Sequence, residues 1–369
     1  MPVKVKDVMA CLENMAPPSY AEKWDNVGLM TGSMENDAET VMLTLDVTPD
    51  VAEQAVKQKV QMIVSHHPLI FAPLKTLAET SWQNRMLAAI IRSGIAVYSA
   101  HTNLDSAAGG VNDVLAEKLG LMDVSILDTS RTELLCKIVV FVPRDYADKV
   151  RTAMTNAGAG HIGKYSDCTF MAEGTGTFRP LDGTEPFIGK KDRLEKVDEV
   201  RLETIIRESD EKKVLSAMIK AHPYEEVAYD IYPLKNKLSV AGLGRIGALQ
   251  QPLTARQLAG HVKKALKADA VTYTDAGRKI KKVAVCGGAG ADFLDVALMQ
   301  GADAFVTGDV KYHAAQKALF AGLTVIDAGH QATEMPVLDR LRETLSTIKG
   351  LKLITAKEKI VIRQLQEGL

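Results

Sequence analysis

The stretch QMIVSHHPLIF, residues 61–71, places an apolar run directly before two adjacent histidines, His66 and His67. The run at 61–65 is typical of a buried β-strand, and Pro68 cannot extend the pairing of that strand because it lacks a backbone N–H. The strand is therefore predicted to end where the histidines begin. In an open α/β sheet, ligands bind at the carboxyl ends of the strands, so the histidine pair marks a candidate site.

The sequence around this strand predicts an α/β fold. Apolar runs near 41–46 and 95–100 alternate with helical patterns at 50–59 and 82–93, which is typical of βαβ units in a mostly parallel sheet. Residues from about 235 onward repeat the pattern, with short β-rich runs that end in turn residues: KKVAVCGGAG, ADAFVTGDV and LTVIDAGHQATE.

The middle of the chain has a different order of elements. LLCKIVVFVP and EVRLETIIR are predicted strands, RDYADKVRTAMTNAG and DEKKVLSAMIKAH are predicted helices, and EGTGTFRPLDG is predicted to be a glycine-rich loop. This order predicts a ferredoxin-like α+β module inserted into a larger domain. We therefore expect a two-lobed α/β domain formed by 1–128 and 234–369, with the insertion at 129–233.

Composition excludes several classes of function. The 369 residues carry a net charge of -1, which gives no electrostatic indication of nucleic-acid binding. The apolar runs fall far short of the roughly 20 residues that span a bilayer, and the first residues do not resemble a signal peptide, so we expect a cytoplasmic protein. The four cysteines include no C-x-x-C pair, so any metal site is expected to use histidine and carboxylate ligands.

Histidines and carboxylates also follow two other predicted strands. His101 and Asp105 come after the strand at 95–100, and His330 and Glu334 come after a strand at 323–327 with the spacing that puts both on one face of a helix. Gly308 and Asp309 follow one more strand. If these strand ends lie side by side, the side chains converge on one pocket that suits one or two divalent metals.

Two adjacent histidines on an irregular turn can face different ions, and a carboxylate can bridge two ions about 3.5 to 4 Å apart. The tandem His66–His67 therefore favours a dinuclear site. Each of these motifs also has a simpler structural interpretation. An HH pair can be a surface or capping feature, and Asp105 can be a turn former. The recurrence of such groups at three strand ends is what favours the metal site.

Five stretches together resemble the NIF3-like dinuclear-metal proteins, also labelled GTP cyclohydrolase I type 2 homologs. They are EKWDNVGLMTG (22–32), SHHPLIF (65–71), YSAHTNLD (98–105), VTGDVKYH (306–313) and DAGHQATE (327–334). The middle region is similar to the PII/CutA-like insertion of the longer bacterial members, through AGAGHIGKYSDCTF, EGTGTFRPLDGTEPFIG and HPYEEVAYDIYPL.

The resemblance implies a set of metal ligands and an assembly. The implied ligands are His66, His67, Asp105, His330 and Glu334. Glu334 is implied to bridge two divalent ions, with His67 and Asp105 on one ion and His66 and His330 on the other. We expect zinc first, with iron and manganese as alternatives. His101 is similar to a family residue near the metals, so it is a candidate general base or substrate ligand, or else a hydrogen-bond partner of a ligand. The implied assembly is a toroidal homohexamer.

Three further motifs allow two interpretations each. CGGAG at 286–290 could cradle a phosphate, or could serve tight packing of a strand against a helix, which we favour. HPYEEVAYDIYPL at 222–234 offers His222, Glu225 and Glu226 as a ligand patch, although a structural role at a helix end is favoured. Trp24 could line the pocket with Asp25 and Asn26, or anchor the N-terminal helix.

The leading functional hypothesis is metal-assisted hydrolysis, and the family label implies a GTP-cyclohydrolase-like opening of a purine ring. Phosphoester hydrolysis would use the same five ligands. The competing hypothesis is a regulatory or metal-handling hexamer without enzymatic activity, whose insertion senses a small molecule.

Overall fold

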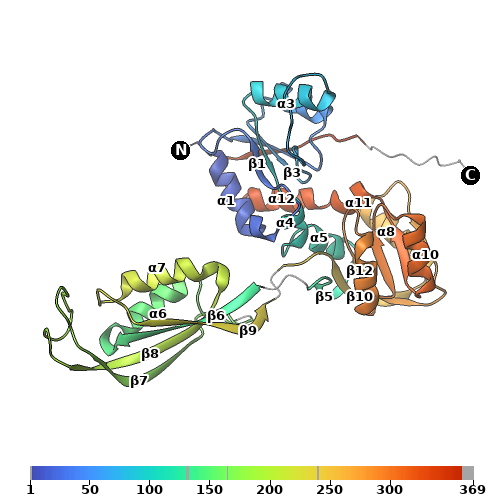
Figure 1. Cartoon of the computed structure of the whole chain (residues 1–369). Coiled ribbons are helices and arrows are strands. Elements are labelled where there is room, and N and C mark those ends of the chain that lie inside the picture. The colour runs from blue at the N-terminus through green and yellow to red at the C-terminus, as the bar shows by residue number, and fades with distance from the viewer. Residues whose placement is uncertain (1, 130–132, 164, 239–240, 360–369) are drawn as a thin grey trace, which may run out of the picture. The chain divides into compact units, whose positions relative to one another are not determined.

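The computed structural model describes residues 2–129, 133–163, 165–238 and 241–359 (Figure 1). The chain divides into two compact units, one formed by Met1–Arg131 with Ala241–Leu369 and the other by Thr132–Val240. No helix in the described part of the chain is long and apolar enough to cross a membrane.

The first unit contains a five-stranded sheet with the order β1-β4-β3-β2-β15. Its central strands run parallel, and β1 pairs antiparallel with β4 at one edge. The strands are β1 (Gly28–Thr31), β2 (Thr40–Thr44), β3 (Met62–Ser65), β4 (Ala96–Ser99) and β15 (Lys352–Thr355).

This first sheet is buried on both faces, which explains the continuous apolar runs that predict its strands. Met62 and Val64 of β3 face a core shared with α1 (Val5–Met15) and α12 (Val337–Leu345). The alternate residue Ile63 faces a second core, shared with the other two helices. Those helices are α2 (Pro49–Lys57) and α3 (Trp82–Arg92).

The same unit holds a second, six-stranded sheet with the order β11-β14-β13-β12-β10-β5. Its strands are β5 (Met122–Ile126), β10 (Arg245–Leu253), β11 (Thr272–Tyr273), β12 (Ile280–Val285), β13 (Ala304–Thr307) and β14 (Thr324–Asp327). One face packs on α5 (Val111–Lys118) and α8 (Ala255–Leu266), and the other on α9 (Leu294–Met299) and α10 (Tyr312–Phe320).

The expectation of a mostly parallel arrangement is wrong for this second sheet. Only β12, β13 and β14 run parallel, whereas β10 is antiparallel to both of its neighbours and β11 is antiparallel to β14. The edge strands β5 and β11 are largely exposed, so they lack the apolar run that marks a parallel, doubly covered strand.

The inserted unit has the order β-α-β-β-α-β and one antiparallel sheet, β7-β8-β6-β9, which is the ferredoxin-like arrangement. Its elements are β6 (Glu133–Pro143), α6 (Ala147–Asn156), β7 (Thr169–Phe178), β8 (Glu195–Arg207), α7 (Glu211–Ala221) and β9 (Tyr229–Leu238). Both helices share one apolar core with this sheet.

The glycine-rich stretch in this unit is not simply a loop as predicted, because Glu173–Phe178 forms the end of β7. Gly176 pairs with Val197 of β8, and a Cβ there would lie 1.9 Å from Glu199 Oε2. The glycine therefore lies in a paired strand, beside the carboxylate of Glu199, rather than in a turn.

Candidate metal centre

The ends of three strands carry the predicted site residues. His66 and His67 follow β3, and their backbone N–H groups still donate to Thr44 and Leu45 across the sheet, at 3.1 and 2.9 Å. The next residue is Pro68, which has no N–H to give, so the pairing ends there as expected. The histidines are thus fixed by the sheet up to the point where it stops.

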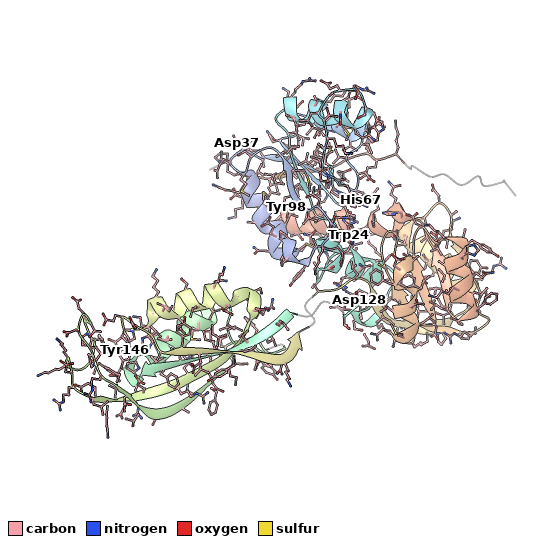
Figure 2. The ribbon with its side chains drawn as sticks, viewed as in Figure 1. Trp24, Asp37, His67, Tyr98, Asp128 and Tyr146 are labelled. Carbon is pink, nitrogen blue, oxygen red and sulfur yellow. The ribbon has the colours of Figure 1, made fainter. Side chains whose placement is uncertain are left out.

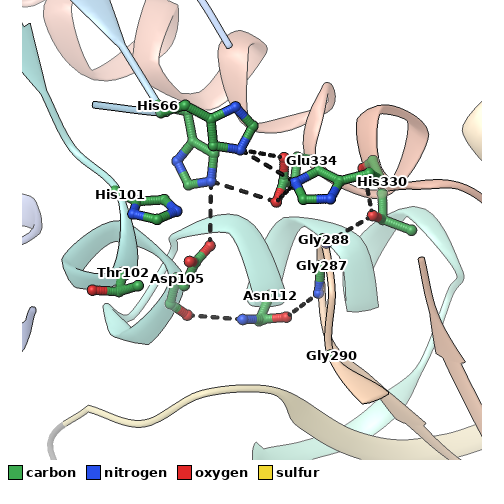
Figure 3. Close-up of polar contacts among 12 residues, drawn as sticks. His66, His101, Thr102, Asp105, Asn112, Gly287, Gly288, Gly290, His330 and Glu334 are labelled. Atoms are coloured by element: carbon green, nitrogen blue, oxygen red, sulfur yellow. Dashed lines mark hydrogen bonds and ion pairs between the residues drawn. The ribbon is translucent and has the colours of Figure 1, made fainter. Parts of the chain in front are cut away.

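The other residues stand on short helices that begin just past their strands. Asp105 lies on α4 (Thr102–Ser106) after β4, with His101 at the N-terminal end of this helix. His330 and Glu334 lie on α11 (His330–Glu334) after β14. The structure therefore brings all six predicted residues to one place between the two sheets (Figure 3).

Glu334 is at the centre of this group. One carboxylate oxygen lies 3.1 Å from His67 Nε2, and the other lies 3.2 Å from His330 Nε2 and 3.7 Å from His66 Nε2. Asp105 Oδ1 lies 3.6 Å from His66 Nε2, and the Nε2 atoms of His67 and His330 are 3.3 Å apart. The distances group His66 with Asp105 and His67 with His330, which differs from the pairing that the resemblance implies.

Buried polar atoms without partners face the same place. His66 Nε2, Asp105 Oδ1 and Glu334 Oε2 have no hydrogen-bond partner among the described residues. Their contacts are ionic: His66 Nε2 with Asp105 and Glu334, and Glu334 Oε2 with His67. An unsatisfied buried nitrogen or carboxylate oxygen is costly, and an ion is one of the partners that relieves this cost. The donor set of imidazole nitrogen and carboxylate oxygen suits a divalent cation. The described residues could therefore hold a metal ion here.

The charges of the group are mutually dependent. Burial alone would raise the pKa of Glu334, but the neighbouring His66, His330 and His67 outweigh it and hold the pKa well below its usual range. Burial alone would lower the pKa of His67, yet the hydrogen bond with Asp46 and the contact with the Glu334 carboxylate raise it to about 10. The hydrogen bond to Glu334 raises the pKa of His330 to about 9. Because an imidazole binds a metal through a deprotonated nitrogen, metal binding here would compete with protonation of His67 and His330.

Each imidazole is fixed through its Nδ1 atom. His67 Nδ1 lies 2.9 Å from Asp46, His330 Nδ1 lies 2.7 Å from Asp309, and His66 Nδ1 lies 2.8 Å from the carbonyl oxygen of Ala100. A carboxylate or carbonyl on Nδ1 sets the tautomer that leaves Nε2 free for a metal. The sequence prediction includes Asp309 but omits Asp46, although Asp46 also follows a strand, β2, and this position is the signal that could have found it.

His101 is not a hydrogen-bond partner of any of the five predicted ligands. Its Nδ1 atom lies 2.8 Å from Asp25, and its ring lies 5.3 and 5.5 Å from the rings of His66 and His67. Trp24 is 60% exposed and lies 6.1 Å from the His101 ring, so it borders the centre rather than anchoring the N-terminal helix (Figure 2).

Glycines let a loop approach the centre closely. A Cβ on Gly288 would lie 2.2 Å from Glu334 Oε1 and 3.2 Å from His330 Nε2. The N–H groups of Gly287 and Gly288 donate to Asn112 and to a threonine of α11 (Figure 3). These contacts support the packing interpretation of CGGAG over the phosphate cradle, since the donors are already used.

His222 has a structural role, as favoured from the sequence. Its side chain is buried, its Nε2 lies 3.0 Å from the carbonyl oxygen of Phe141, and it ends α7. Glu225 accepts the N–H of Glu185 and so ties down the long loop between β7 and β8.

Comparisons with known proteins agree with this architecture. The model of the family described as Duf34/NIF3 (NGG1p interacting factor 3) matches residues 3–361. The chain is 46% identical over 334 residues to the "GTP cyclohydrolase 1 type 2 homolog" of Bacillus subtilis, covering 90% of each chain. It is 37% identical over 358 residues to the Mycobacterium tuberculosis protein of the same name, covering 96% of this chain and 94% of the relative.

Solved structures give the same result. A Bacillus cereus protein related to NIF3 superposes with a TM-score of 0.89 at 42% identity, covering 97% of this chain and 98% of that one. A Staphylococcus aureus protein superposes with a TM-score of 0.79 at 29% identity, covering 99% of both. The chain therefore belongs to the Duf34/NIF3 family.

Proposed function

We propose that this protein is a metal-dependent hydrolase with two divalent ions in one centre. The proposed ligands are His66, His67, Asp105, His330 and Glu334. The observation that carries the proposal is the arrangement around Glu334, whose two oxygens face separate imidazoles while buried atoms of His66 and Asp105 stay unpaired. Zinc suits these nitrogen and oxygen donors, and iron or manganese would also be accepted.

Two such ions, when bound, would polarise the substrate and lower the pKa of a water toward neutrality. The chain's own contribution is to hold the ligands rigidly and to keep a proton acceptor nearby. We assign the acceptor role to His101, because its Nε2 has no hydrogen-bond partner among the described residues and its ring borders both His66 and His67.

We propose a nucleotide as the substrate, on the strength of the name carried by the relatives. The surroundings of the centre support a partly apolar substrate. A pocket of about 190 Å³ reaches from Asp46 and His67 to Leu69 and Trp82. Trp24 and Phe71, both more than half exposed, lie 6.0 Å apart, and Trp24 lies 6.1 Å from the His101 ring, so the pair offers aromatic surface near the centre.

The test is turnover of GTP, other nucleotides and phosphoesters by zinc-, manganese- and iron-loaded protein. We expect His101→Ala to lose turnover while metal content stays at the wild-type value. His313→Ala, which removes an exposed histidine from α10, is the matched control and should keep both. A wild-type protein that turns over none of these substrates, or a His101→Ala protein that keeps full turnover, would refute the proposal.

A second candidate function is regulatory, and one observation favours it. The inserted unit, which we propose to be PII/CutA-like, holds a pocket of about 390 Å³ lined by the aromatic side chains of Phe141, Phe178, Phe187 and Tyr224. A pocket of this size and composition suits a small molecule. In that case the chain would act as a homohexamer that responds to an effector or handles metal. Absence of turnover together with tight binding of a metabolite to the insertion would favour this function.

A further inference from the structure

Asp25 lies in the loop before β1, and its carboxylate is fully buried beside His101. Oδ1 lies 2.8 Å from His101 Nδ1 and accepts the N–H of Asn26 at 2.8 Å. Oδ2 accepts the N–H of Thr102 at 3.0 Å and its hydroxyl at 2.5 Å. Four donors on one carboxylate fix its position and satisfy its charge without a lysine or arginine.

The charge of Asp25 is maintained by these contacts. Burial would raise the pKa of Asp25, but the hydrogen bonds from His101 and Thr102 outweigh burial and lower the pKa to about 2. An ionised carboxylate can only accept, so the proton between Asp25 and His101 resides on Nδ1 of the imidazole. In the neutral imidazole, Nε2 of His101 is then the lone-pair nitrogen.

A ring nitrogen of His101 lies at the centre, and because Nδ1 is held by Asp25, Nε2 is the nitrogen left for this position. The ligand atoms of His66, His67 and His101 all lie within 4.8 Å of one another. His67 and His330 are held by Asp46 and Asp309 in the same way, so three Asp–His pairs converge here. Unlike the other two, His101 lies on the side that Trp24 borders, next to exposed aromatic surface.

We propose that Asp25 is a positioning residue, which fixes His101 with Nδ1 protonated and with Nε2 as the acceptor that faces the centre. The inference rests on the proposed hydrolytic function. When a water attacks the substrate, one of its O–H bonds breaks and the proton passes to Nε2 of His101. The imidazolium that forms donates Nδ1–H to Asp25, whose negative charge stabilises it.

The kinetic test is a double-mutant cycle on the zinc-loaded protein. Asp25→Asn should lower kcat by roughly 10- to 100-fold, the usual effect of losing a partner that orients a working histidine. In a His101→Ala background the same change should alter the small residual kcat by less than about twofold, because Asp25 acts through His101. Asp37→Asn, at an exposed aspartate paired with Lys4, is the matched control and should have no effect.

The structural test does not depend on turnover. Neutron diffraction from crystals of the zinc-loaded protein should place a deuteron on His101 Nδ1 and none on Nε2, and Asp25→Asn should change this distribution while zinc content is retained. A deuteron on Nε2, zinc bound to Nε2, or zinc loss in Asp25→Asn would overturn the inference. If no substrate is turned over, the proposed hydrolase fails, but the diffraction result still decides the role of Asp25.

Discussion

Replacement of Gly288 by alanine should disable the metal centre from a position that supplies no ligand. Gly288 has a φ of +64°, and the added Cβ would lie 2.2 Å from Glu334 Oε1. That separation is more than 1 Å short of an ordinary contact, which begins near 3.4 Å. Glu334 is buried, so its carboxylate has to shift by about 1 Å, whereas functional constellations tolerate roughly 0.5 Å. We expect metal affinity to fall roughly 10- to 100-fold.

The control separates backbone strain from the steric contact. Gly301 has a similar φ of +73°, but a Cβ there meets nothing within 4 Å. Both alanine variants should therefore share the cost of a left-handed residue, about 1–2 kcal/mol, which urea unfolding of the metal-free proteins measures. Only Gly288→Ala should also weaken zinc binding in competition with a chromophoric chelator. Equal zinc affinity in the two variants would refute the reasoning.

Two further predictions concern stability. In the metal-free protein the pKa values of His67 and His330 are raised to about 10 and 9. The two protonated histidines therefore stabilise the fold fully below about pH 6.5, the usual histidine pKa. This stabilisation is lost as the pH rises through about 9 and 10. The unfolding temperature of the metal-free protein should decrease as the pH rises from 6.5 to 10. Alanine at both positions should make this temperature nearly independent of pH. An unfolding temperature of the wild type that rises over this range would contradict the assignment. Arg245 is buried and donates to both oxygens of Asp113 and to three carbonyl oxygens, so Arg245→Met should cost about 3 kcal/mol in urea unfolding. Arg256→Met, at an exposed position of α8, should cost almost nothing, and equal losses would show that burial of the ion pair is irrelevant.

The parallel part of the fold and the strand-end positions of the site were predictable because both have local signals. Apolar runs such as 61–65 are long enough to read as strands, and Pro68 marks where pairing stops. His66 and His67 could therefore be placed at a sheet edge without any structure. Their approach to His330 and Glu334 could not, because these two residues follow β14 of the other sheet and the contact depends on how two separate sheets meet.

The partners that fix the histidines had weaker signals. Asp46 is 21 residues from His67, and Asp25 is 76 residues from His101, so no spacing in the sequence links the members of either pair. The antiparallel strands β5 and β11 lack apolar runs because they are largely exposed. Gly176 was predicted to be a loop residue because glycine is typical of loops, whereas its pairing with Val197 is a contact between strands that the sequence does not mark.

The long insertion is joined to the surrounding unit at the ends of two paired strands, β5 and β10. On one side, β5 and β10 pair up to Ile126 and Arg245, and the hydrogen bonds continue to Asp128 and Leu243. On the other side, the insertion's own first and last strands pair with each other. The entropy of closing a loop grows only with the logarithm of its length, and here a folded module already holds its two ends together. For the surrounding unit, gaining or losing this module is therefore thermodynamically close to exchanging one hairpin turn for another.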